Sequence, residues 1–343
     1  MLASVCVLFY NNHAAAAPSA RLENKLMTKL GLITMAAVFA AAQVGAQNAP
    51  KPKRINRAIE LLEAGQPIYY TGGRGGYDEG KKMGATKADY INYEMEHGAF
   101  DMKELRDFMR GLVDAGPTRT GHRTPAVIVT LPILGKDPAA MRANYWVAQQ
   151  VMAAGVHGIL LCHAENPEAV KIFVESLRYP FSEKHAGLDT GIRGNGSQNF
   201  ASQIWGLQPT EYMLKADMWP LNKNGEVLLG VKIETPMAAE NAEKTTKIPG
   251  LGFAEWGPGD QSFFLVGPPT GTGRGGERES HPAMKKVRER IFKASKAANL
   301  FFLNSCNEQN VVDMLKEGVM ICTGGETPAA EIGRQFTKRQ GTW

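Results

Sequence analysis

The sequence predicts an α/β protein whose parallel strands and helices alternate to form a (β/α)₈ TIM barrel. Eight apolar runs of strand length are separated by stretches of helical composition, a pattern that favours a parallel sheet. The chain has 343 residues, enough for a barrel of about 250 residues and an insertion. An open, doubly wound sheet is the alternative, but no Gly-x-Gly-x-x-Gly motif follows the first strand.

The expected strands are rich in β-branched and aromatic residues, which suit a pleated sheet. They span residues 67–71, 90–94, 126–131, 158–162, 227–234, 253–256, 300–303 and 319–322. Helices are expected over residues 102–115, 138–154, 167–177, 281–298 and 308–317, and residues 236–249 carry the chain back across the sheet as a further helix. No repeat or second domain interrupts this alternation.

The N-terminal segment has the pattern of an export signal. Lys29 precedes an apolar run over residues 30–42, and small residues follow before Gln47. The run is too short to cross a bilayer comfortably, although an uncleaved anchor is the alternative. We therefore expect residues 1–46 to be a leader and signal peptide and residues 47–343 to form one barrel domain. The protein is then exported, with the periplasm as its compartment.

Charge and cysteine content exclude several classes of protein. The net charge of +5 is spread over the whole chain, and no basic run is interleaved with aromatic residues, which excludes nucleic acid as a partner. Cys162, Cys306 and Cys322 are widely spaced, unlike a zinc motif or a disulfide framework. We expect them to be buried free thiols, although an oxidising compartment permits one bridge.

Two carboxylates follow neighbouring strands and form a candidate metal site. Glu234 ends the run Val231-Lys232-Ile233-Glu234, and Asp260 follows the turn Gly257-Pro258-Gly259. Catalytic residues of (β/α)₈ barrels lie at the carboxyl ends of the strands, and carboxylate oxygens are suitable ligands for Mg²⁺ or Mn²⁺. A salt bridge to an internal cation is the alternative role for the pair.

Two further residues can serve catalysis. Lys232 lies two positions before Glu234 and therefore faces the same side of the strand. It can be a counter-ion, an anchor for an anionic substrate or a Schiff-base nucleophile, and nearby carboxylates favour the first two roles. His97 ends the second strand beside Glu96, where a carboxylate can orient its ring for acid–base work.

Two long segments break the alternation of strands and helices. The first, an insertion over about residues 181–229, contains Arg193; the second, over residues 267–279, is rich in Gly, Pro and Thr. Long loops in compact domains are often functional, so either segment can close over the barrel mouth. Arg193 is then a candidate anchor for an anionic substrate.

Six segments of the chain resemble motifs of the HpcH/HpaI aldolase/citrate lyase family. The shared segments are Glu94-x-Glu96-His97, Leu177-Arg178-Tyr179-Pro180, Gly191-x-Arg193-Gly194, Ile233-Glu234-Thr235, Gly257-Pro258-x-Asp260 and His281-Pro282. The resemblance covers roughly residues 60–330. It implies a barrel of the phosphoenolpyruvate/pyruvate-binding type, a homo-oligomer (trimer or hexamer) with a swapped C-terminal helix, and a divalent metal held by Glu234 and Asp260. It also implies aldol cleavage, with His97 as the base.

The chain departs from the family pattern at three positions. An arginine that stabilises the enolate in the pyruvate aldolases is replaced by Leu131, and an aspartate that assists the histidine falls at Ala153. The glutamine two residues before the metal glutamate is Lys232. Lys232 or Arg193 can restore the missing positive charge, and His163 with Glu165, just beyond the fourth strand, can replace the acid–base partner.

The sequence therefore predicts an exported aldehyde-lyase that depends on a divalent metal, Mg²⁺ or Mn²⁺ with Co²⁺ also suitable. It would cleave a small anionic hydroxy-oxo acid through an enolate to pyruvate or a related oxo acid and an aldehyde. Glu234 and Asp260 hold the metal, His97, Lys232 and Arg193 act on the substrate, and Gly257, Pro258 and Gly259 receive its carboxylate. An exported, non-catalytic binding protein for metal and carboxylate is the alternative.

Overall fold

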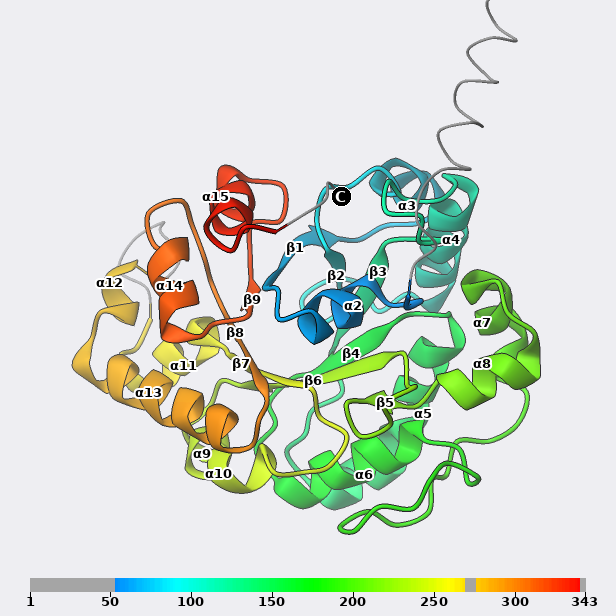
Figure 1. The fold of residues 1–343 in the computed structure, drawn as a ribbon. Coiled ribbons are helices and arrows are strands. Elements are labelled where there is room, and N and C mark those ends of the chain that lie inside the picture. The colour runs from blue at the N-terminus through cyan, green and yellow to red at the C-terminus, as the bar shows by residue number, and fades with distance from the viewer. Residues whose placement is uncertain (1–52, 269–275, 340–343) are drawn as a thin grey trace, which may run out of the picture. The chain divides into compact units, whose positions relative to one another are not determined.

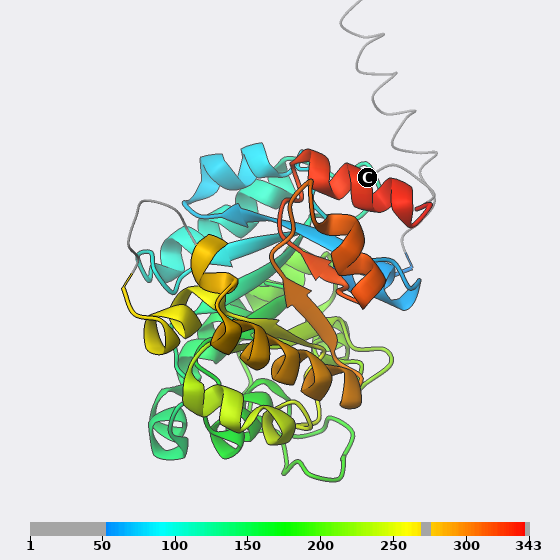
Figure 2. The same cartoon turned by 90° about the vertical axis from the view of Figure 1, so that its left-hand side faces the viewer.

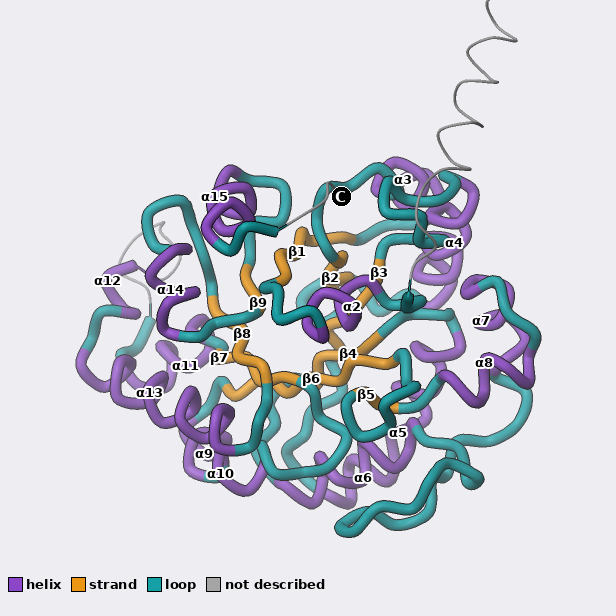
Figure 3. The backbone as a smooth tube through the Cα atoms, viewed as in Figure 1, coloured by secondary structure: helices purple, strands orange, loops and turns teal. Residues whose placement is uncertain are grey.

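Eight parallel strands close into a barrel, as the sequence predicts (Figures 1 and 3). The computed structural model describes residues 53–268 and 276–339, so the expected leader lies outside the described residues. The strands are β1 (Ile68–Gly73), β2 (Tyr90–Glu94), β3 (Ala126–Leu131), β4 (Gly158–Leu161), β6 (Val227–Ile233), β7 (Phe253–Trp256), β8 (Phe301–Asn304) and β9 (Ile321–Cys322). The pairings of β4 with β6 and of β9 with β1 complete the closure. A two-residue strand, β5 (Met218–Trp219), pairs with the start of β6.

Helices lie on the outside of the sheet, as Figures 1 and 2 show. They are α2 (Arg57–Glu63), α3 (Tyr77–Met83), α4 (Met102–Asp114), α5 (Pro138–Ala153), α6 (Pro167–Leu177), α7 (Gln198–Trp205), α8 (Pro209–Lys215), α9 (Pro236–Glu240), α10 (Ala242–Thr245), α11 (Pro258–Leu265), α12 (Gly276–Glu279), α13 (Pro282–Ala297), α14 (Val311–Glu317) and α15 (Pro328–Phe336). The one helix expected over residues 236–249 is in fact two short helices, α9 and α10. The other expected helices are confirmed, with ends that differ by at most three residues.

The barrel interior is apolar at one end and polar at the other. Inward-facing Ile68, Ile128, Leu228 and Phe253 pack against α2, which lies across the end of the barrel where the strands begin (Figure 1). Since side chains alternate along a strand, the next inward positions nearer the strand ends include polar residues such as Lys232. The apolar end is thus closed, and the polar mouth is where a ligand can enter.

The insertion does not cover this mouth. Its helices α7 and α8 lie beside α5, and the indole of Trp205 donates a hydrogen bond of 2.8 Å to the carbonyl of Gly155. The same indole stacks on His157, which directly precedes β4. These contacts lie near the end of the barrel where the strands begin, so the expectation that the insertion closes the mouth is wrong. Residues 269–275 of the second long segment lie outside the described residues.

The cysteines differ in part from the expectation. Cys306 and Cys322 form a disulfide that links the segment after β8 to β9, so the expectation of free thiols is wrong for these two. Cys162 is free and buried, as expected. Among the described residues, no helix combines the length and the apolar character needed to span a bilayer.

Candidate metal centre

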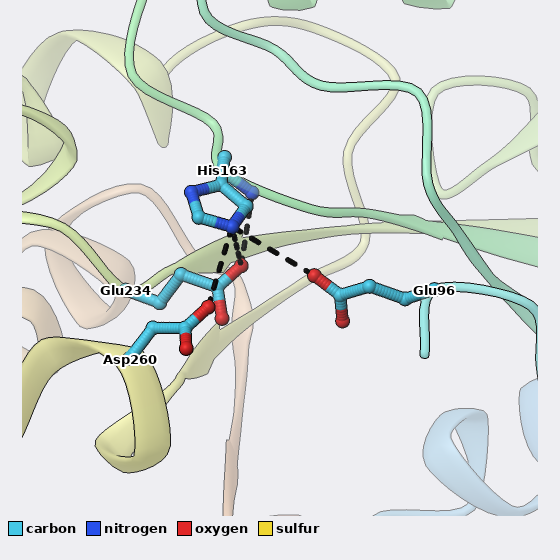
Figure 4. A group of neighbouring side chains, drawn as sticks. All are labelled: Glu96, His163, Glu234 and Asp260. Carbon is cyan, nitrogen blue, oxygen red and sulfur yellow. Dashed lines mark hydrogen bonds and ion pairs between the residues drawn. The ribbon is translucent and has the colours of Figure 1, made fainter. Parts of the chain in front are cut away.

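Four side chains with metal-binding chemistry converge at the mouth (Figure 4). Glu96 follows β2, His163 follows β4, Glu234 directly follows β6, and Asp260 lies in the first turn of α11 after β7. One ligand atom from each lies within 4.8 Å of the others. Because all four strands run in parallel, their carboxyl ends bring together residues that are far apart in the sequence. We call these four residues the mouth cluster.

Lys232 pairs with two carboxylates of the mouth cluster. Its Nζ lies 2.7 Å from Oε2 of Glu96 and 3.1 Å from Oε2 of Glu234. Burial lowers the pKa of Lys232, but the carboxylates of Glu255 and Glu234 outweigh this effect and raise the pKa above its ordinary value. The ammonium therefore stays charged at neutral pH, which supports the role of counter-ion and disfavours a Schiff-base nucleophile.

The mouth cluster fits a divalent cation. The side chain of Glu96 is only 6% exposed, and its Oε1 is buried without a hydrogen-bond partner among the described residues. A buried carboxylate oxygen with no donor is costly, and a bound cation would satisfy it. Its neighbours are the carboxylates of Glu234 and Asp260 and the imidazole of His163, all of which are metal ligands in other proteins.

Glycine at position 257 lets the chain pass close to the mouth cluster. A Cβ at this position would lie 2.5 Å from Cβ of Glu234 and 2.8 Å from its Oε2, so any other residue would push this carboxylate away. Gly257 caps α11, and a Cβ at the next glycine, Gly259, would meet no atom within 4 Å. The backbone at Pro258 and Gly259 therefore borders open space beside Asp260.

His97 lies at the edge of the mouth cluster and is largely exposed. Its side chain is 67% exposed, and its Nε2 is 3.4 Å from Oε2 of Glu96. The backbone N–H groups of Glu96 and His97 both donate to the carboxylate of Glu94 and so hold the turn that presents the imidazole. A substrate in the mouth can reach this ring.

Arg193 is not part of the mouth cluster. It is buried, its guanidinium donates to the hydroxyl of Tyr212 at 3.0 Å and it stacks over the ring of Tyr179. The hydroxyl of Tyr212 in turn donates to the carbonyl of Met152, near the end of α5. Arg193 thus holds the insertion against the barrel, and its position does not support the expected role as a substrate anchor.

Two of the three positions that depart from the family pattern are buried and apolar. Leu131 ends β3 and is inaccessible to solvent. Ala153 is the last residue of α5 and is 4% exposed. Neither side chain supplies a charge to the mouth.

Glu255 shares the inward face of the barrel with Lys232. It lies two residues after the inward-facing Phe253, and the strand register places it opposite Lys232. Burial raises the pKa of Glu255 to about 7 from its ordinary value of 4.5, and the charge on Lys232 offsets only part of that increase. At neutral pH this carboxyl is close to half protonated.

A mainly apolar pocket opens beside the mouth cluster. It has a volume of about 430 Å³ and lies between the segment after β3 and the start of α5. Its lining residues are Phe100, Pro132, Ile133, Leu134, Lys136, Ala140, Asn144 and Val147. Nζ of Lys136 is 3.8 Å from Glu165, whose carboxylate is 3.8 Å from Nδ1 of His163, so the pocket and the cluster are neighbours.

Fold and site together define a (β/α)₈ barrel protein with a candidate divalent-metal centre at its mouth. The fold is similar to that of an HpcH/HpaI aldolase/citrate lyase family protein from Burkholderia cenocepacia J2315, with a TM-score of 0.59, 18% identity, and coverage of 82% of this chain and 96% of that chain. An HpcH/HpaI aldolase from Desulfitobacterium hafniense DCB-2 gives a TM-score of 0.56 and 18% identity over 82% of this chain and 97% of that chain. Macrophomate synthase gives a TM-score of 0.54 and 19% identity over 84% of this chain and 88% of that chain.

These similarities confirm the predicted fold resemblance to the HpcH/HpaI family. The identities are low, so the chain is a divergent structural relative. No family model and no curated protein sequence matches the chain. The reaction therefore has to be argued from the mouth itself.

The raised pKa of Glu255 predicts how stability depends on pH. Between pH 4.5 and about 7 the folded protein holds a proton on Glu255 that the unfolded chain has lost, so stability falls as the pH rises through this window. Glu255→Gln removes this dependence. Relative to the variant, the metal-free wild type should lose about 2–3 kcal/mol of unfolding free energy between pH 5 and pH 8.

Denaturant unfolding of both proteins across this range measures the difference. Glu308→Gln, which alters an exposed carboxylate on the segment before α14, is the matched control and should run parallel to wild type. If the unfolding free energy of Glu255→Gln also ran parallel to that of wild type across this pH range, the pKa of the Glu255 carboxyl would not be raised in the folded protein.

Proposed function

We propose that the protein is a divalent-metal-dependent carbon–carbon lyase that cleaves a hydroxy-oxo acid to an oxo acid, such as pyruvate, and an aldehyde. The observation that carries the proposal is the mouth cluster with the adjoining His97, in which a buried oxygen of Glu96 has no hydrogen-bond partner among the described residues. The HpcH/HpaI neighbours are named as aldolases or citrate lyase family proteins, which supports a lyase.

Different residues of the mouth would hold the metal and the substrate. Glu234 and Asp260 would hold the cation, which when bound withdraws electron density from a substrate carbonyl and so favours formation of an enolate. Of the backbone at positions 257–259, the N–H of Gly257 already donates to the carbonyl of Ile233 and Pro258 has no N–H, so the N–H of Gly259 would receive the substrate carboxylate in the open space at the start of α11. Lys232 would keep two of the cluster carboxylates in place.

His97 would move the proton in this reaction. It would accept the hydroxyl proton of the substrate as the carbon–carbon bond breaks, while the electron pair of that bond passes to the oxo-acid fragment as an enolate. His97, which then carries that proton, would return it to the enolate carbon to give the oxo acid. The exposed ring of His97 is accessible to substrate. Its Nε2 faces the carboxylate of Glu96, which can only accept, so Nδ1 is the nitrogen left to accept a proton.

The apolar pocket supports a substrate with an apolar extension. A 430 Å³ space lined by Phe100, Ile133 and Leu134 is larger than pyruvate needs, and apolar walls favour an alkyl or aromatic group. We therefore propose that the aldehyde half of the substrate carries such a group.

A non-catalytic metal and carboxylate binder is the second candidate. Leu131 favours it, because this buried side chain supplies no charge where the resemblance expects an arginine. Export and self-association also remain predictions from the sequence.

Exchange of the methyl protons of pyruvate with D₂O tests the lyase directly, because it requires only enolate formation. NMR should detect exchange in the presence of Mn²⁺-loaded and Mg²⁺-loaded protein that chelator abolishes. Glu234→Gln should abolish it, and His97→Asn should slow it about 10²–10⁴-fold. Asp313→Asn, an exposed change on α14, is the control. Metal binding without exchange would instead favour the non-catalytic binder.

Filling the pocket tests the proposed apolar extension. Ala140→Trp places an indole on the pocket wall and should weaken turnover or inhibition by oxo acids with long apolar groups, while exchange into pyruvate is retained. Ala139→Trp alters the neighbouring exposed position of α5, which does not line the pocket, and is the matched control. Equal losses with small and large substrates would contradict the assignment of the pocket.

A further inference from the structure

In each of the two glutamates of the mouth cluster, the two carboxylate oxygens face different partners. Oε2 of Glu96 and Oε2 of Glu234 face Nζ of Lys232, at 2.7 and 3.1 Å. Their Oε1 atoms face His163 instead (Figure 4). Lys232 therefore occupies one side of the two carboxylates, and the other side is directed at the imidazole. On that side, Oε1 of Glu96 lacks a hydrogen-bond partner among the described residues.

The spacing around His163 is close to that of ligands around an ion. Its Nε2 lies 3.3 Å from Oδ2 of Asp260, 3.8 Å from Oε1 of Glu234 and 3.9 Å from Oε1 of Glu96. Ligand atoms around a tetrahedral ion with bonds of about 2.0–2.2 Å lie about 3.3–3.6 Å apart. The distance to Asp260 falls in this range, and the two glutamate distances are slightly longer. One imidazole nitrogen that faces three carboxylates can donate to only one of them, whereas an ion satisfies all three.

One hydrogen bond and one nearby carboxylate surround His163. Its backbone N–H donates to Oε1 of Glu234 at 3.0 Å. Its Nδ1 has no hydrogen-bond partner among the described residues, and the carboxylate of Glu165 lies 3.8 Å from it. Metal-binding histidines usually donate from the second ring nitrogen to a carboxylate, and Glu165 is the nearby group that could accept. The backbone of His163 also adopts a left-handed conformation, with φ of 45°, which is uncommon for a residue other than glycine.

We infer that Nε2 of His163 is a metal ligand and that the centre therefore selects a transition-metal dication over Mg²⁺. Imidazole nitrogen binds ions such as Zn²⁺, Fe²⁺ or Co²⁺ well, whereas Mg²⁺ prefers oxygen ligands and retains water. Three carboxylates and the Lys232 ammonium leave two formal negative charges, which a dication balances. The inference rests on the proposed metal-dependent function, but it concerns the ligand set, which the family resemblance does not supply.

Co²⁺ and Mg²⁺ binding to the chelator-treated, full-length chain tests this inference without substrate. Calorimetry should show tighter binding of Co²⁺ than of Mg²⁺. His163→Asn keeps a residue type that tolerates the left-handed backbone and removes the imidazole. Since changes behind a ligand alone cost about 10–100-fold in metal affinity, loss of the ligand should weaken Co²⁺ binding about 100-fold or more. Mg²⁺ binding should be nearly unchanged.

His281→Asn is the matched control, because it removes an exposed histidine that caps α13, outside the mouth cluster, and should leave both metal affinities as they are. Pulsed EPR of the Mn²⁺-loaded protein provides a structural readout: nitrogen coupling should be present in wild type and in His281→Asn and absent in His163→Asn. Coupling that persists in His163→Asn would overturn the inference, as would equal weakening of Co²⁺ and Mg²⁺ binding.

These outcomes are separate from those of the lyase proposal. Nitrogen coupling from His163 with no exchange into pyruvate would overturn the lyase and leave the ligand assignment intact. Exchange that depends on Glu234, with no nitrogen coupling, would overturn the ligand assignment alone.

Discussion

The ammonium of Lys232 is the interaction on which the mouth depends. Three carboxylates within a few ångströms repel one another, and two of them, Glu96 and Glu234, are almost fully buried. Burial of unpaired charge is costly, so such a cluster persists only with a compensating cation. Lys232 supplies one at 2.7 and 3.1 Å and leaves Oε1 of each glutamate directed at His163. A second cation can then enter from the opposite side.

The barrel makes this arrangement rigid. Lys232 lies on β6, between strands whose register is set by continuous pairing, and its neighbour on the inward face is Glu255. Beneath it the interior is filled with apolar side chains and closed by α2, so the charges are confined to one end. This separation explains why the same molecule holds a stable apolar core and a strongly charged mouth.

Much of the fold could be predicted from the sequence, because parallel strands buried on both faces read as apolar runs of strand length. All eight strands are found where expected, and Glu234 and Asp260 lie together because Glu234 directly follows β6 and Asp260 lies in the first turn of the helix after β7. Placement of the insertion could not be predicted, because the direction in which a long loop folds depends on contacts such as that of Trp205 with Gly155, which local composition does not encode. The disulfide between Cys306 and Cys322 could not be predicted either, because it depends on the adjacency of β8 and β9 in the folded barrel.

Two residues of the site have a larger role in the structure than the sequence predicts. The sequence predicts Glu96 only as the neighbour of His97 and His163 only as a substitute acid–base group, yet both belong to the mouth cluster (Figure 4). Each lies two residues past the end of its strand, and this shared position is the signal that could have identified them.

Diffraction at the manganese absorption edge, from crystals soaked in Mn²⁺, is the most direct test that the mouth is a metal centre. The structure predicts one strong anomalous peak among Glu96, His163, Glu234 and Asp260, with Lys232 still paired to the far oxygens of the glutamates. A mouth without a peak, at Mn²⁺ concentrations that load other sites on the protein, would contradict the metal centre and with it the proposed chemistry.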